Sequence, residues 1–487
     1  MAIELSNETF TNQADIVPAS GVEEIVNTGI ANTLAGKNKI TGNGETLRDF
    51  FWGLRTIGIY NKSNGTISTD NGDDEITGYG NIGIYNESNG TINTGNGRDK
   101  ITGYARQTGS SKNNTVGVFN YGTINTDSGD DTISGYATGD YPGGVINIGS
   151  INTGNGDDNI IGDGLSGGVS NGAGGTINTG NGDDSIIGTS SQDWGVYNGG
   201  YTEESGFPTI NTGNGNDSII GTTTGSNAAG IAVVYKGTIN TGNGNDSIIG
   251  TGLISGIICN DDGIIDTGDG DDILTGIGVI ALGSFSGSNS SKATIKTGKG
   301  NDIITGMTGI SNDTLSTIDT DAGNDSIISE EHFTNRGNIF LGDGNDSMAA
   351  DSVFSEGTLE NFGFIGTGDG SDIITSTGII YNQGVIETGN GDDSIIVDKG
   401  FDGSGNVLLG NSKDYLKGFG SGNFNGGNGQ DTLELTSGSY TVGISGTTVS
   451  FTKSGVIMQT SEFEKLIAGG TTYDFSSLTA NQTIFVA

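Results

Sequence analysis

Short runs of apolar residues alternate with polar, glycine-rich runs through most of the chain. A typical stretch, from Thr176 to Gly188, reads Thr-Ile-Asn-Thr-Gly-Asn-Gly-Asp-Asp-Ser-Ile-Ile-Gly. Each apolar run is a few residues long, rich in Ile, Val and Thr, and bounded by Gly or Asn, which is typical of short strands joined by turns. The density of glycine disfavours helices. The pattern therefore predicts an all-β protein.

The same motif returns along the chain with small changes. A second element precedes it, an apolar pair followed by asparagine, as in Gly58–Asn61 and Gly83–Asn86. One unit thus holds three short strands, which cannot bury their own apolar face, whereas stacked units share a continuous core. We therefore predict a right-handed parallel β-helix of about 15 rungs, each with three short strands.

The two ends of the chain depart from this repeat. Residues 1–57 are predicted to form an N-terminal capping rung with an insertion at Leu47–Arg55, and Asn38 stands there where the motif has Asp. Residues 58–434 form the predicted β-helix. Residues 435–487 lack the motif and contain longer alternating stretches such as Tyr440–Ile444. They are expected to form a small antiparallel β cap.

Alternation along a strand assigns each side chain to the core or the surface. In Thr-Ile-Asn-Thr the Ile is expected to point inward. For the Ile-Ile pairs we expect the second Ile to point outward or to fold into a corner. These second isoleucines are Ile161, Ile187, Ile220, Ile249, Ile304, Ile328, Ile374 and Ile396. The asparagines of the apolar element are predicted to form a ladder of amide hydrogen bonds.

The composition at first suggests disorder. Of 487 residues 92 are Gly, only 31% are hydrophobic, and the formal net charge is −39. Low apolar content with high charge is the usual signature of a disordered chain, but the strict periodicity argues against it. The excess of acid repels a polyanion, so nucleic acid is not expected as a partner. No apolar run is long enough for a membrane helix, so no membrane insertion is expected.

The chemistry of the side chains narrows the possible functions. A single Cys259 and a single His332 provide neither a disulfide nor a nitrogen and sulfur metal site. We find no Ser/His/Asp set, no phosphate-binding loop and no paired acid and base. The sequence therefore predicts a protein that is not an enzyme.

One carboxylate per rung creates an electrostatic problem. Stacking places the motif aspartates about 4.8 Å apart, where two charges repel by about 3.5 kcal/mol at an effective dielectric constant of 20. A bound cation is required, and all-oxygen ligands in a flexible glycine turn favour Ca²⁺ over Mg²⁺. The predicted ligand aspartates are Asp74, Asp99, Asp131, Asp158, Asp184, Asp217, Asp246, Asp272, Asp302, Asp325, Asp346, Asp372, Asp393, Asp414 and Asp431. The predicted turn glycines are Gly95, Gly97, Gly154, Gly156, Gly180, Gly182, Gly213, Gly215, Gly242, Gly244, Gly427 and Gly429.

The repeat resembles the nonapeptide of the RTX calcium-binding family, Gly-Gly-x-Gly-x-Asp-x-apolar-x. Residues Gly426–Glu434 match it at every fixed position. The resemblance implies that the turn wraps Ca²⁺ between adjacent rungs and that the apolar residue enters the core, which assigns these roles to Gly180, Gly182, Asp184 and Ile186. Two features differ from the family: most copies begin with Thr instead of Gly, and each rung has only one motif. We therefore expect multiple Ca²⁺ along one edge of the β-helix.

Several functions fit such a chain. Residues 1–18 have neither a basic start nor an apolar core, so no secretory signal peptide is evident, and resemblance to RTX proteins implies type I export directed by the C-terminal region. The leading hypothesis is a secreted structural protein of a bacterial cell surface that folds on Ca²⁺ and assembles with itself into a fibril, sheath or S-layer-like coat. Cell-surface polysaccharide is a second candidate partner. The alternatives are a β-helical polysaccharide lyase or epimerase, and an RTX adhesin that binds through inserted loops such as those at 107–114, 199–208 and 281–293.

Overall fold

The computed structural model describes residues 2–18, 23–44, 48–50, 53–107, 115–139, 142–200, 206–283, 291–351 and 357–487. Trp52 and the middle of each inserted loop lie outside these ranges, so the predictions for them are not addressed. The chain divides into two compact units. Unit 1 comprises Met1–Gly268 with Gly276–Gly278, and unit 2 comprises Asp269–Thr275 with Val279–Ala487.

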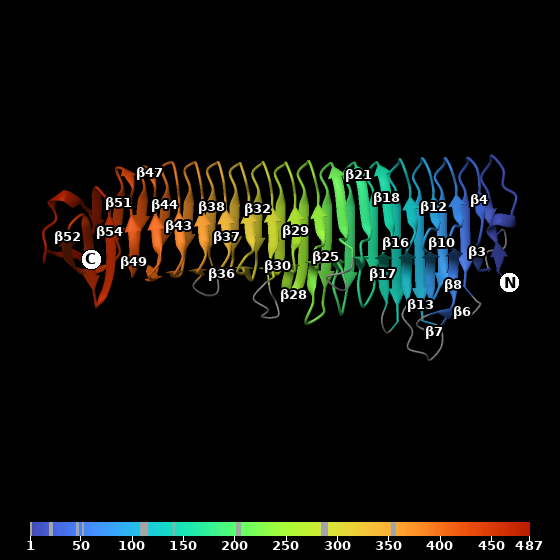
Figure 1. The fold of residues 1–487 in the computed structure, drawn as a ribbon, viewed down its shortest axis with the longest axis horizontal. Coiled ribbons are helices and arrows are strands. Elements are labelled where there is room, and N and C mark those ends of the chain that lie inside the picture. The colour runs from blue at the N-terminus through green and yellow to red at the C-terminus, as the bar shows by residue number, and fades with distance from the viewer. Residues whose placement is uncertain are drawn as a thin grey trace. The chain divides into compact units, whose positions relative to one another are not determined.

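Each unit is a parallel β-helix, as predicted. In unit 1 a representative rung contains β10 (Glu75–Gly80), β11 (Ile82–Asn86) and β12 (Thr91–Asn93). These strands pair in parallel with the corresponding β13 (Lys100–Arg106), β14 (Val116–Asn120) and β15 (Thr123–Asn125) of the next rung. The first two strands of a rung belong to one sheet and the third belongs to another. Three short strands per rung are therefore confirmed. Figure 1 shows the equivalent strands of successive rungs side by side within the unit.

The other strands follow the same plan. Unit 1 also contains β1 (Ile3–Glu4), the 3-10 helix η1 (Leu5–Asn7), β2 (Ile16–Val17), β3 (Ile25–Asn27), β4 (Ile30–Asn32), β5 (Lys39–Asn43), β6 (Arg48–Phe50), β7 (Gly53–Arg55), β8 (Ile57–Asn61), β9 (Thr66–Ser68), β16 (Thr132–Thr138), β17 (Gly143–Asn147), β18 (Ser150–Asn155), β19 (Asn159–Asp163), β20 (Val169–Gly172), β21 (Thr176–Asn181), β22 (Ser185–Ser190), β23 (Val196–Gly199), β24 (Thr209–Asn214), β25 (Ser218–Thr223), β26 (Ala229–Val234), β27 (Thr238–Asn240), β28 (Ser247–Cys259) and β29 (Gly263–Asp266). Strand β30 (Ile273–Leu282) has residues in both units.

Unit 2 contains the remaining strands. They are β31 (Ala293–Lys296), β32 (Ile303–Gly306), β33 (Gly309–Asn312), β34 (Thr317–Asp319), β35 (Ser326–Ser329), β36 (His332–Asn335), β37 (Asn338–Phe340), β38 (Ser347–Ala350), β39 (Thr358–Asn361), β40 (Phe364–Gly366), β41 (Ile373–Ser376), β42 (Ile380–Asn382), β43 (Val385–Glu387), β44 (Ser394–Val397), β45 (Phe401–Gly403), β46 (Asn406–Leu408), β47 (Asn411–Ser412), β48 (Tyr415–Lys417), β49 (Gly422–Asn425), β50 (Asn428–Gly429), β51 (Thr432–Leu435), β52 (Gly438–Ser445), β53 (Thr448–Lys453), β54 (Val456–Ser461), β55 (Lys465–Ala468), β56 (Thr471–Asp474), the 3-10 helix η2 (Phe475–Ser477) and β57 (Thr483–Val486).

The isoleucines of the repeat form the core. Ile177, in Thr-Ile-Asn-Thr, is 0% exposed, as predicted. In the Ser-Ile-Ile copies the first isoleucine, such as Ile186, is buried and the second, Ile187, is half-buried on the outer face. The prediction is wrong for Ile304 and Ile374, which are 0% exposed. In these copies Asp is followed directly by Ile-Ile, and alternation along the strand turns the second residue after Asp inward, whichever residue it is.

The asparagine ladder is confirmed within each unit. In unit 1 the Nδ2 of Asn61 donates to Oδ1 of Asn86 at 2.7 Å, and Asn86 donates to Asn120 at 2.8 Å. In unit 2 the ladder links Asn312, Asn335, Asn361 and Asn382. Val233 and Cys259 occupy this position in later rungs of unit 1. Cys259 is thus a buried thiol, outside any disulfide, at an apolar version of the ladder position.

The C-terminal strands change direction. Strand β52 pairs antiparallel with β53 and β57, and β53 pairs antiparallel with β54, while β54 also pairs in parallel with β49 of the β-helix. The antiparallel strands predicted at this end are therefore present and are joined to the last rung. Among the described residues no helix is long and apolar enough to cross a membrane.

Candidate metal centre

The repeated turn connects the third strand of one rung to the first strand of the next. In the turn Thr94–Asp99, Gly95 and Gly97 have φ of 86° and 140°, which lie in the region that favours glycine. A methyl group on Gly97 would come within 1.8 Å of the carbonyl oxygen of Gly72 in the preceding rung. Glycine is therefore required both by the backbone angle and by the close stacking of turns.

The predicted turn glycines share this geometry with one exception. Positive φ angles are found at Gly95, Gly97, Gly154, Gly156, Gly180, Gly182, Gly213, Gly215, Gly242, Gly244 and Gly427, whereas Gly429 lies in β50 without one. Where the first glycine is absent, Asp70 and Asp127 adopt φ of 58° and 63°. Aspartate tolerates this left-handed conformation better than most residues, which explains the substitution.

The motif aspartates are brought into line within each unit. In unit 1 the backbone N–H of Asp74 donates to Oδ1 of Asp99 at 2.8 Å, and the N–H of Asp99 donates to Oδ1 of Asp131 at 2.7 Å. The same bond continues from Asp158 to Asp184 and onward. In unit 2 it runs from Asp272 to Asp431. Every motif aspartate is at most 2% exposed, so each unit contains a buried carboxylate column.

In most of these carboxylates the second oxygen has no hydrogen-bond donor among the described residues. The Oδ2 atom is buried and unpartnered in Asp74, Asp99, Asp131, Asp158, Asp184, Asp217, Asp302, Asp325, Asp346, Asp372, Asp393, Asp414 and Asp431. A threonine hydroxyl lies close by in most rungs, but its proton is used elsewhere: Thr153, beside Asp158, donates to the carbonyl oxygen of Thr179 at 3.2 Å. A buried ionised oxygen without a partner is strongly unfavourable. The column is incomplete unless a positive charge faces it.

Asn38 shows what surrounds this second oxygen. It occupies the motif position one rung before Asp74, and its N–H donates to Oδ1 of Asp74 at 2.6 Å. Its Nδ2 donates to the carbonyl oxygens of Leu34, Gly36 and Thr69 at 2.9 to 3.1 Å. The side chain at this position thus faces a group of carbonyl oxygens.

Because the strands that follow the turn stack in register from rung to rung, we infer that the same carbonyl groups lie near the motif aspartates. There, however, a carboxylate oxygen replaces the amide N–H group that donates in Asn38. The carboxylate oxygen would then face carbonyl oxygens with no hydrogen bond between them. A cation among them would satisfy both the carboxylate and the carbonyl groups.

Burial has a corresponding effect on proton affinity. Desolvation raises the pKa of Asp131 and Asp184 to about 7, from an ordinary value of 3.8, and that of Asp99 to about 6. The nearby threonine hydroxyl and the N–H group of the preceding rung oppose this effect on the pKa without cancelling it. In unit 2 desolvation likewise raises the pKa of Asp302 and Asp393 to about 7.

The donor set fits Ca²⁺ in its chemistry. Within the described ranges no group of three or more His, Cys, Asp or Glu is gathered as a metal cluster. A cation in the column would therefore take carboxylate oxygens from neighbouring rungs and complete its shell with backbone carbonyl oxygens. Uncharged and anionic oxygens in a glycine-rich turn suit Ca²⁺, which accepts 6 to 8 such ligands. They do not suit metals that prefer nitrogen or sulfur.

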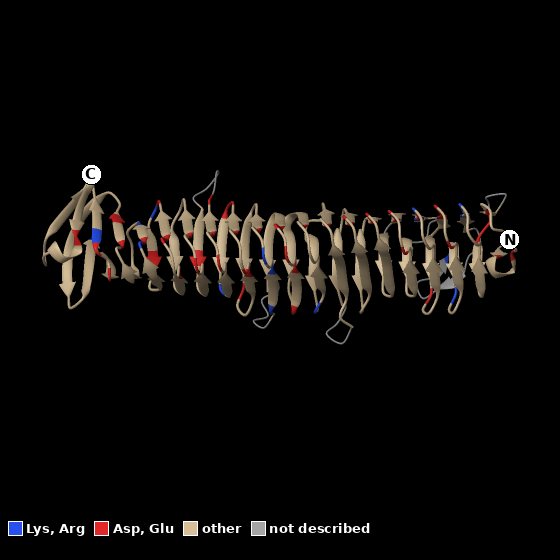
Figure 2. Cartoon of the chain, turned by 90° about the horizontal axis from the view of Figure 1, so that it is seen from above, with Lys and Arg blue, Asp and Glu red and all other residues tan. Residues whose placement is uncertain are grey.

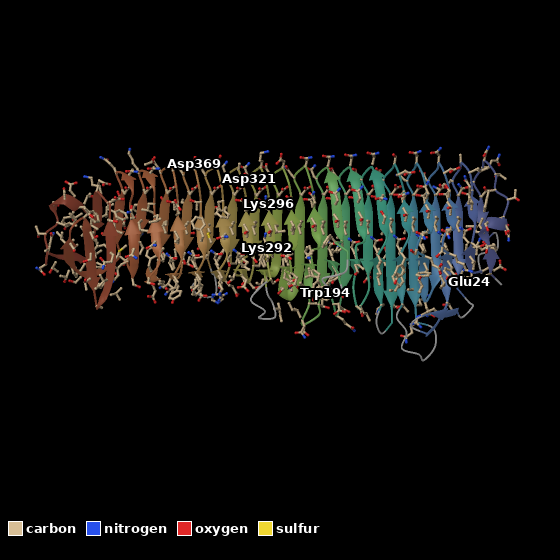
Figure 3. All side chains as sticks on the ribbon, viewed as in Figure 1. Glu24, Trp194, Lys292, Lys296, Asp321 and Asp369 are labelled. Atoms are coloured by element: carbon tan, nitrogen blue, oxygen red, sulfur yellow. The ribbon has the colours of Figure 1, made fainter. Side chains whose placement is uncertain are left out.

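Two other ladders in the same turn were not predicted. Buried threonines at the first motif position bond to one another, as in Thr179 to the carbonyl oxygen of Thr212 at 3.3 Å. On the outer edge, exposed Asn and Asp side chains form further files: Asn181 Nδ2 donates to Asn155 Oδ1 at 2.8 Å. Asp369, labelled in Figure 3, is in the corresponding outer file of unit 2. Threonine in place of the family glycine was the sequence signal for the first of these ladders.

Comparisons with known proteins give little guidance. No protein-family model matches the chain, and no curated protein matches it. RTX membership therefore stays a prediction. One similar solved structure is a hyperactive, Ca²⁺-dependent, β-helical antifreeze protein from an Antarctic bacterium. It is 17% identical, with a TM-score of 0.38, over 78% of this chain and 95% of that one. Similarity at this level does not establish a shared function.

Proposed function

We propose that this chain is a secreted, Ca²⁺-binding structural protein of a bacterial cell surface. The observation that carries the proposal is the buried carboxylate column in which Asn38 hydrogen-bonds to carbonyl oxygens and the aspartates cannot. The chain's own residues hold the site in place: the turn glycines allow the rungs to approach, and the inter-rung N–H bonds orient each Oδ1. The ion supplies the positive charge that the column lacks.

Calcium would make folding conditional on the compartment. The formal net charge of −39 and the buried carboxylates oppose folding when Ca²⁺ is scarce, as in a bacterial cytosol. Outside the cell, abundant Ca²⁺ binds the folded form and stabilises it by mass action. This logic suits type I export of an unfolded chain, followed by folding at the cell surface.

The test is a folding titration of the full chain. The chain in chelator is expected to lose β-sheet circular dichroism, and added Ca²⁺ is expected to restore it together with a large rise in melting temperature. Mg²⁺ at equal concentration serves as the control and is expected to restore much less. Spectra and melting temperatures that are unchanged by chelator at neutral pH would contradict the proposal.

We further propose that the Ca²⁺-loaded protein associates with itself into a fibril, sheath or S-layer-like coat. Support comes from the regular outer strand faces, where Thr and Asn alternate with buried Ile, as in Thr176 and Asn178 around Ile177. Flat, repetitive faces favour side-by-side contact between copies. Electron microscopy at high protein concentration with Ca²⁺ is expected to show filaments or sheets; monodisperse particles would contradict assembly.

An enzyme acting on acidic polysaccharide is the less favoured alternative. Binding a polyanion requires a basic groove. Figure 2 shows Lys and Arg as isolated positions within each unit rather than as a patch. The absence of lyase activity on alginate and pectin is therefore expected.

A further inference from the structure

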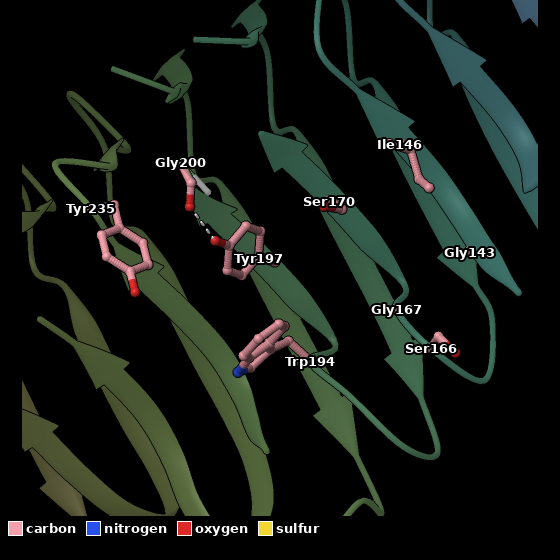
Figure 4. Close-up of a pocket in the computed structure, with 9 residues that line it drawn as sticks. All are labelled: Gly143, Ile146, Ser166, Gly167, Ser170, Trp194, Tyr197, Gly200 and Tyr235. Atoms are coloured by element: carbon pink, nitrogen blue, oxygen red, sulfur yellow. Dashed lines mark hydrogen bonds between the residues drawn. The ribbon is translucent and has the colours of Figure 1, made fainter. Parts of the chain in front are cut away.

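A hollow of about 290 Å³ opens on the outer face of unit 1 (Figure 4), and no motif aspartate is among the described residues that line it. Its floor is Ser170 on β20, which stands in register between Ile146 on β17 and Tyr197 on β23. Because serine is small, the space beside it stays open, whereas in the two neighbouring rungs a large side chain occupies the corresponding space. The volume is near the lower end of the range for small-molecule sites.

Aromatic rings line one side of the hollow. The rings of Trp194 and Tyr197 lie 4.8 Å apart, inclined by 32°. The Tyr197 hydroxyl donates to the carbonyl oxygen of Gly200 at 2.7 Å, which holds its ring in place. Figure 4 shows Tyr235 on the same side and Ser166 and Ser170 on the other. The Tyr197 ring is thus fixed before any ligand arrives.

Tyr235 adopts an unfavourable backbone conformation to reach this position. Its φ is 48°, in a turn where other rungs have Ala173 at 48° and Asp261 at 51°. Left-handed geometry is uncommon and energetically unfavourable for a bulky residue. Strain of this kind often marks a functional position. The strained backbone places the ring of Tyr235 against the hollow, which is consistent with a functional role for this ring.

A second, independent observation is the hydroxyl of Ser166. Its Oγ atom is buried and has no hydrogen-bond partner among the described residues, yet the residue lines the hollow. Buried hydroxyls are usually bonded, because an unmet hydrogen bond is unfavourable. Rotation of this side chain toward a ligand hydroxyl group in the hollow would meet this need.

We infer that the hollow binds a neutral sugar ring of a polysaccharide. Aromatic faces pack against the C–H faces of sugars, and serine hydroxyls pair with sugar hydroxyls. No Asp, Glu, Lys or Arg lines the hollow among the described residues, so a charged ligand would have no ion-pair partner. The site would attach the protein to a glycan without using Ca²⁺.

The neighbouring rungs indicate a polymer rather than a free sugar. The outward file that contains Ile146 continues to Phe119, Tyr85 and Tyr60. The rings of Tyr85 and Phe119 lie 5.6 Å apart, and those of Tyr60 and Tyr85 lie 5.5 Å apart. Phe119 is only 3% exposed, whereas Tyr85 and Tyr60 are half-buried, so a glycan chain that follows this file would contact the rings of Tyr85 and Tyr60 beyond the hollow.

Binding is tested with the full Ca²⁺-loaded chain by calorimetry against neutral gluco-, manno-, galacto- and N-acetylglucosamine oligosaccharides. Trp194→Ala and Ser166→Ala are each expected to weaken binding about tenfold or more. Longer oligosaccharides are expected to bind more tightly than the monosaccharide. Tyr235→Asn should also lose affinity but keep or raise the melting temperature, because asparagine accepts the left-handed turn. If Tyr235 had only a structural role, sugar affinity and melting temperature would not change in different directions in this variant.

The matched control is Tyr79→Ala, which removes an exposed ring of unit 1 that stacks on Tyr104, outside the hollow. It is expected to leave affinity unchanged. The proposal is overturned if none of these sugars binds, or if the three variants bind as well as the parent chain. It is also overturned if choline, a quaternary ammonium probe for an aromatic cation site, binds in place of sugars.

Discussion

The backbone N–H of Asp158 donates to Oδ1 of Asp184 at 2.8 Å, and both carboxylates are at most 1% exposed. Asp184 is thus held by the rung before it, while its second oxygen has no donor among the described residues. The relationship recurs through both units. The carboxylates are therefore held in position, but in most of them the negative charge has no positive partner among the described residues. The predictions on metal binding and on pH dependence follow from this.

Replacing one column aspartate by asparagine should separate folding from metal binding. Asp158→Asn places an amide N–H group where Asn38 already donates to three carbonyl oxygens. In chelator the variant is expected to be more stable than the parent by about 1 to 3 kcal/mol. With Ca²⁺ it should bind fewer ions, as measured by calorimetry.

Asp157→Asn is the matched control, because this neighbouring aspartate lies on the exposed outer file. It should change neither measurement appreciably. The reciprocal change, Asn38→Asp, is expected to extend the column by one rung and to weaken folding in chelator. If Asp158→Asn destabilises the chelated protein as much as Asp158→Ala does, the carbonyl surroundings inferred for the column are incorrect.

The metal-free protein should be more stable in acid than at neutral pH. Desolvation raises the pKa of Asp131 to about 7 and that of Asp99 to about 6 in the folded form, above the ordinary value of 3.8. The folded state therefore binds protons more tightly than the unfolded state. The resulting stability is fully present below the ordinary value and is lost as pH rises through the folded values.

Thermal melts of metal-stripped protein check this dependence. The melting temperature should fall between about pH 5 and about pH 8, and Ca²⁺ should remove most of the fall. Asp131→Asn should reduce the slope, whereas a change at the exposed Asp130 should not. A metal-free protein that becomes more stable as pH rises over this range would contradict the raised pKa values.

Loss of a ladder asparagine should be costly. Asn120 donates to Oδ1 of Asn147 at 2.8 Å and to the carbonyl oxygen of Ser150 at 2.9 Å, and it accepts from Asn86 at 2.8 Å. Asn120→Leu leaves several buried polar groups unpaired, so the free energy of unfolding should fall by about 2 to 4 kcal/mol. Denaturant unfolding with Ca²⁺ present measures it.

The half-buried Asn125 offers a comparison in the same rung, since it lies in a surface file beside Asn152. Asn125→Ala should cost less than about 1 kcal/mol. Equal losses at both sites would mean that the buried ladder contributes no more than a surface one.

The strands and their stacking were predictable because Ile, Asn and Asp recur at matching places in every unit. The error at Ile304 and Ile374 shows the limit of reading the pair alone: the inward position is fixed by its distance from Asp302 or Asp372. The pattern could assign the aspartates to one column. It could not show which atoms surround each Oδ2, because the types of the residues do not determine the directions of the backbone carbonyl groups.

The saccharide hollow escaped prediction for a different reason. It depends on Ser170 lying in register between Ile146 and Tyr197 and on Tyr235 from a later rung. Ile146, Ser170 and Tyr197 each directly precede a ladder asparagine, so their register could be read from the sequence. The hollow itself could not, because it depends on how the side chains of Trp194 and Tyr235 are placed around Ser170.

The threonine ladder should contribute to folding without holding the metal. Thr179 donates to the carbonyl oxygen of Thr212 at 3.3 Å, which is one ordinary hydrogen bond between rungs. The chain already replaces this threonine by leucine at Leu341 and Leu409, both 0% exposed, so an apolar side chain fits the position. Thr179→Val is therefore expected to cost about 1 kcal/mol of unfolding free energy.

Its Ca²⁺ affinity should stay within a few-fold of the parent value, because the proposed ligands are carboxylate and backbone oxygens. Thr179→Ser, which keeps the hydroxyl, is the companion variant for both measurements. If Thr179→Val loses Ca²⁺ affinity by about tenfold and Thr179→Ser does not, the hydroxyl is itself a ligand. The ladder would then belong to the metal centre, and the substitution of Thr for the family glycine would have a direct role in binding.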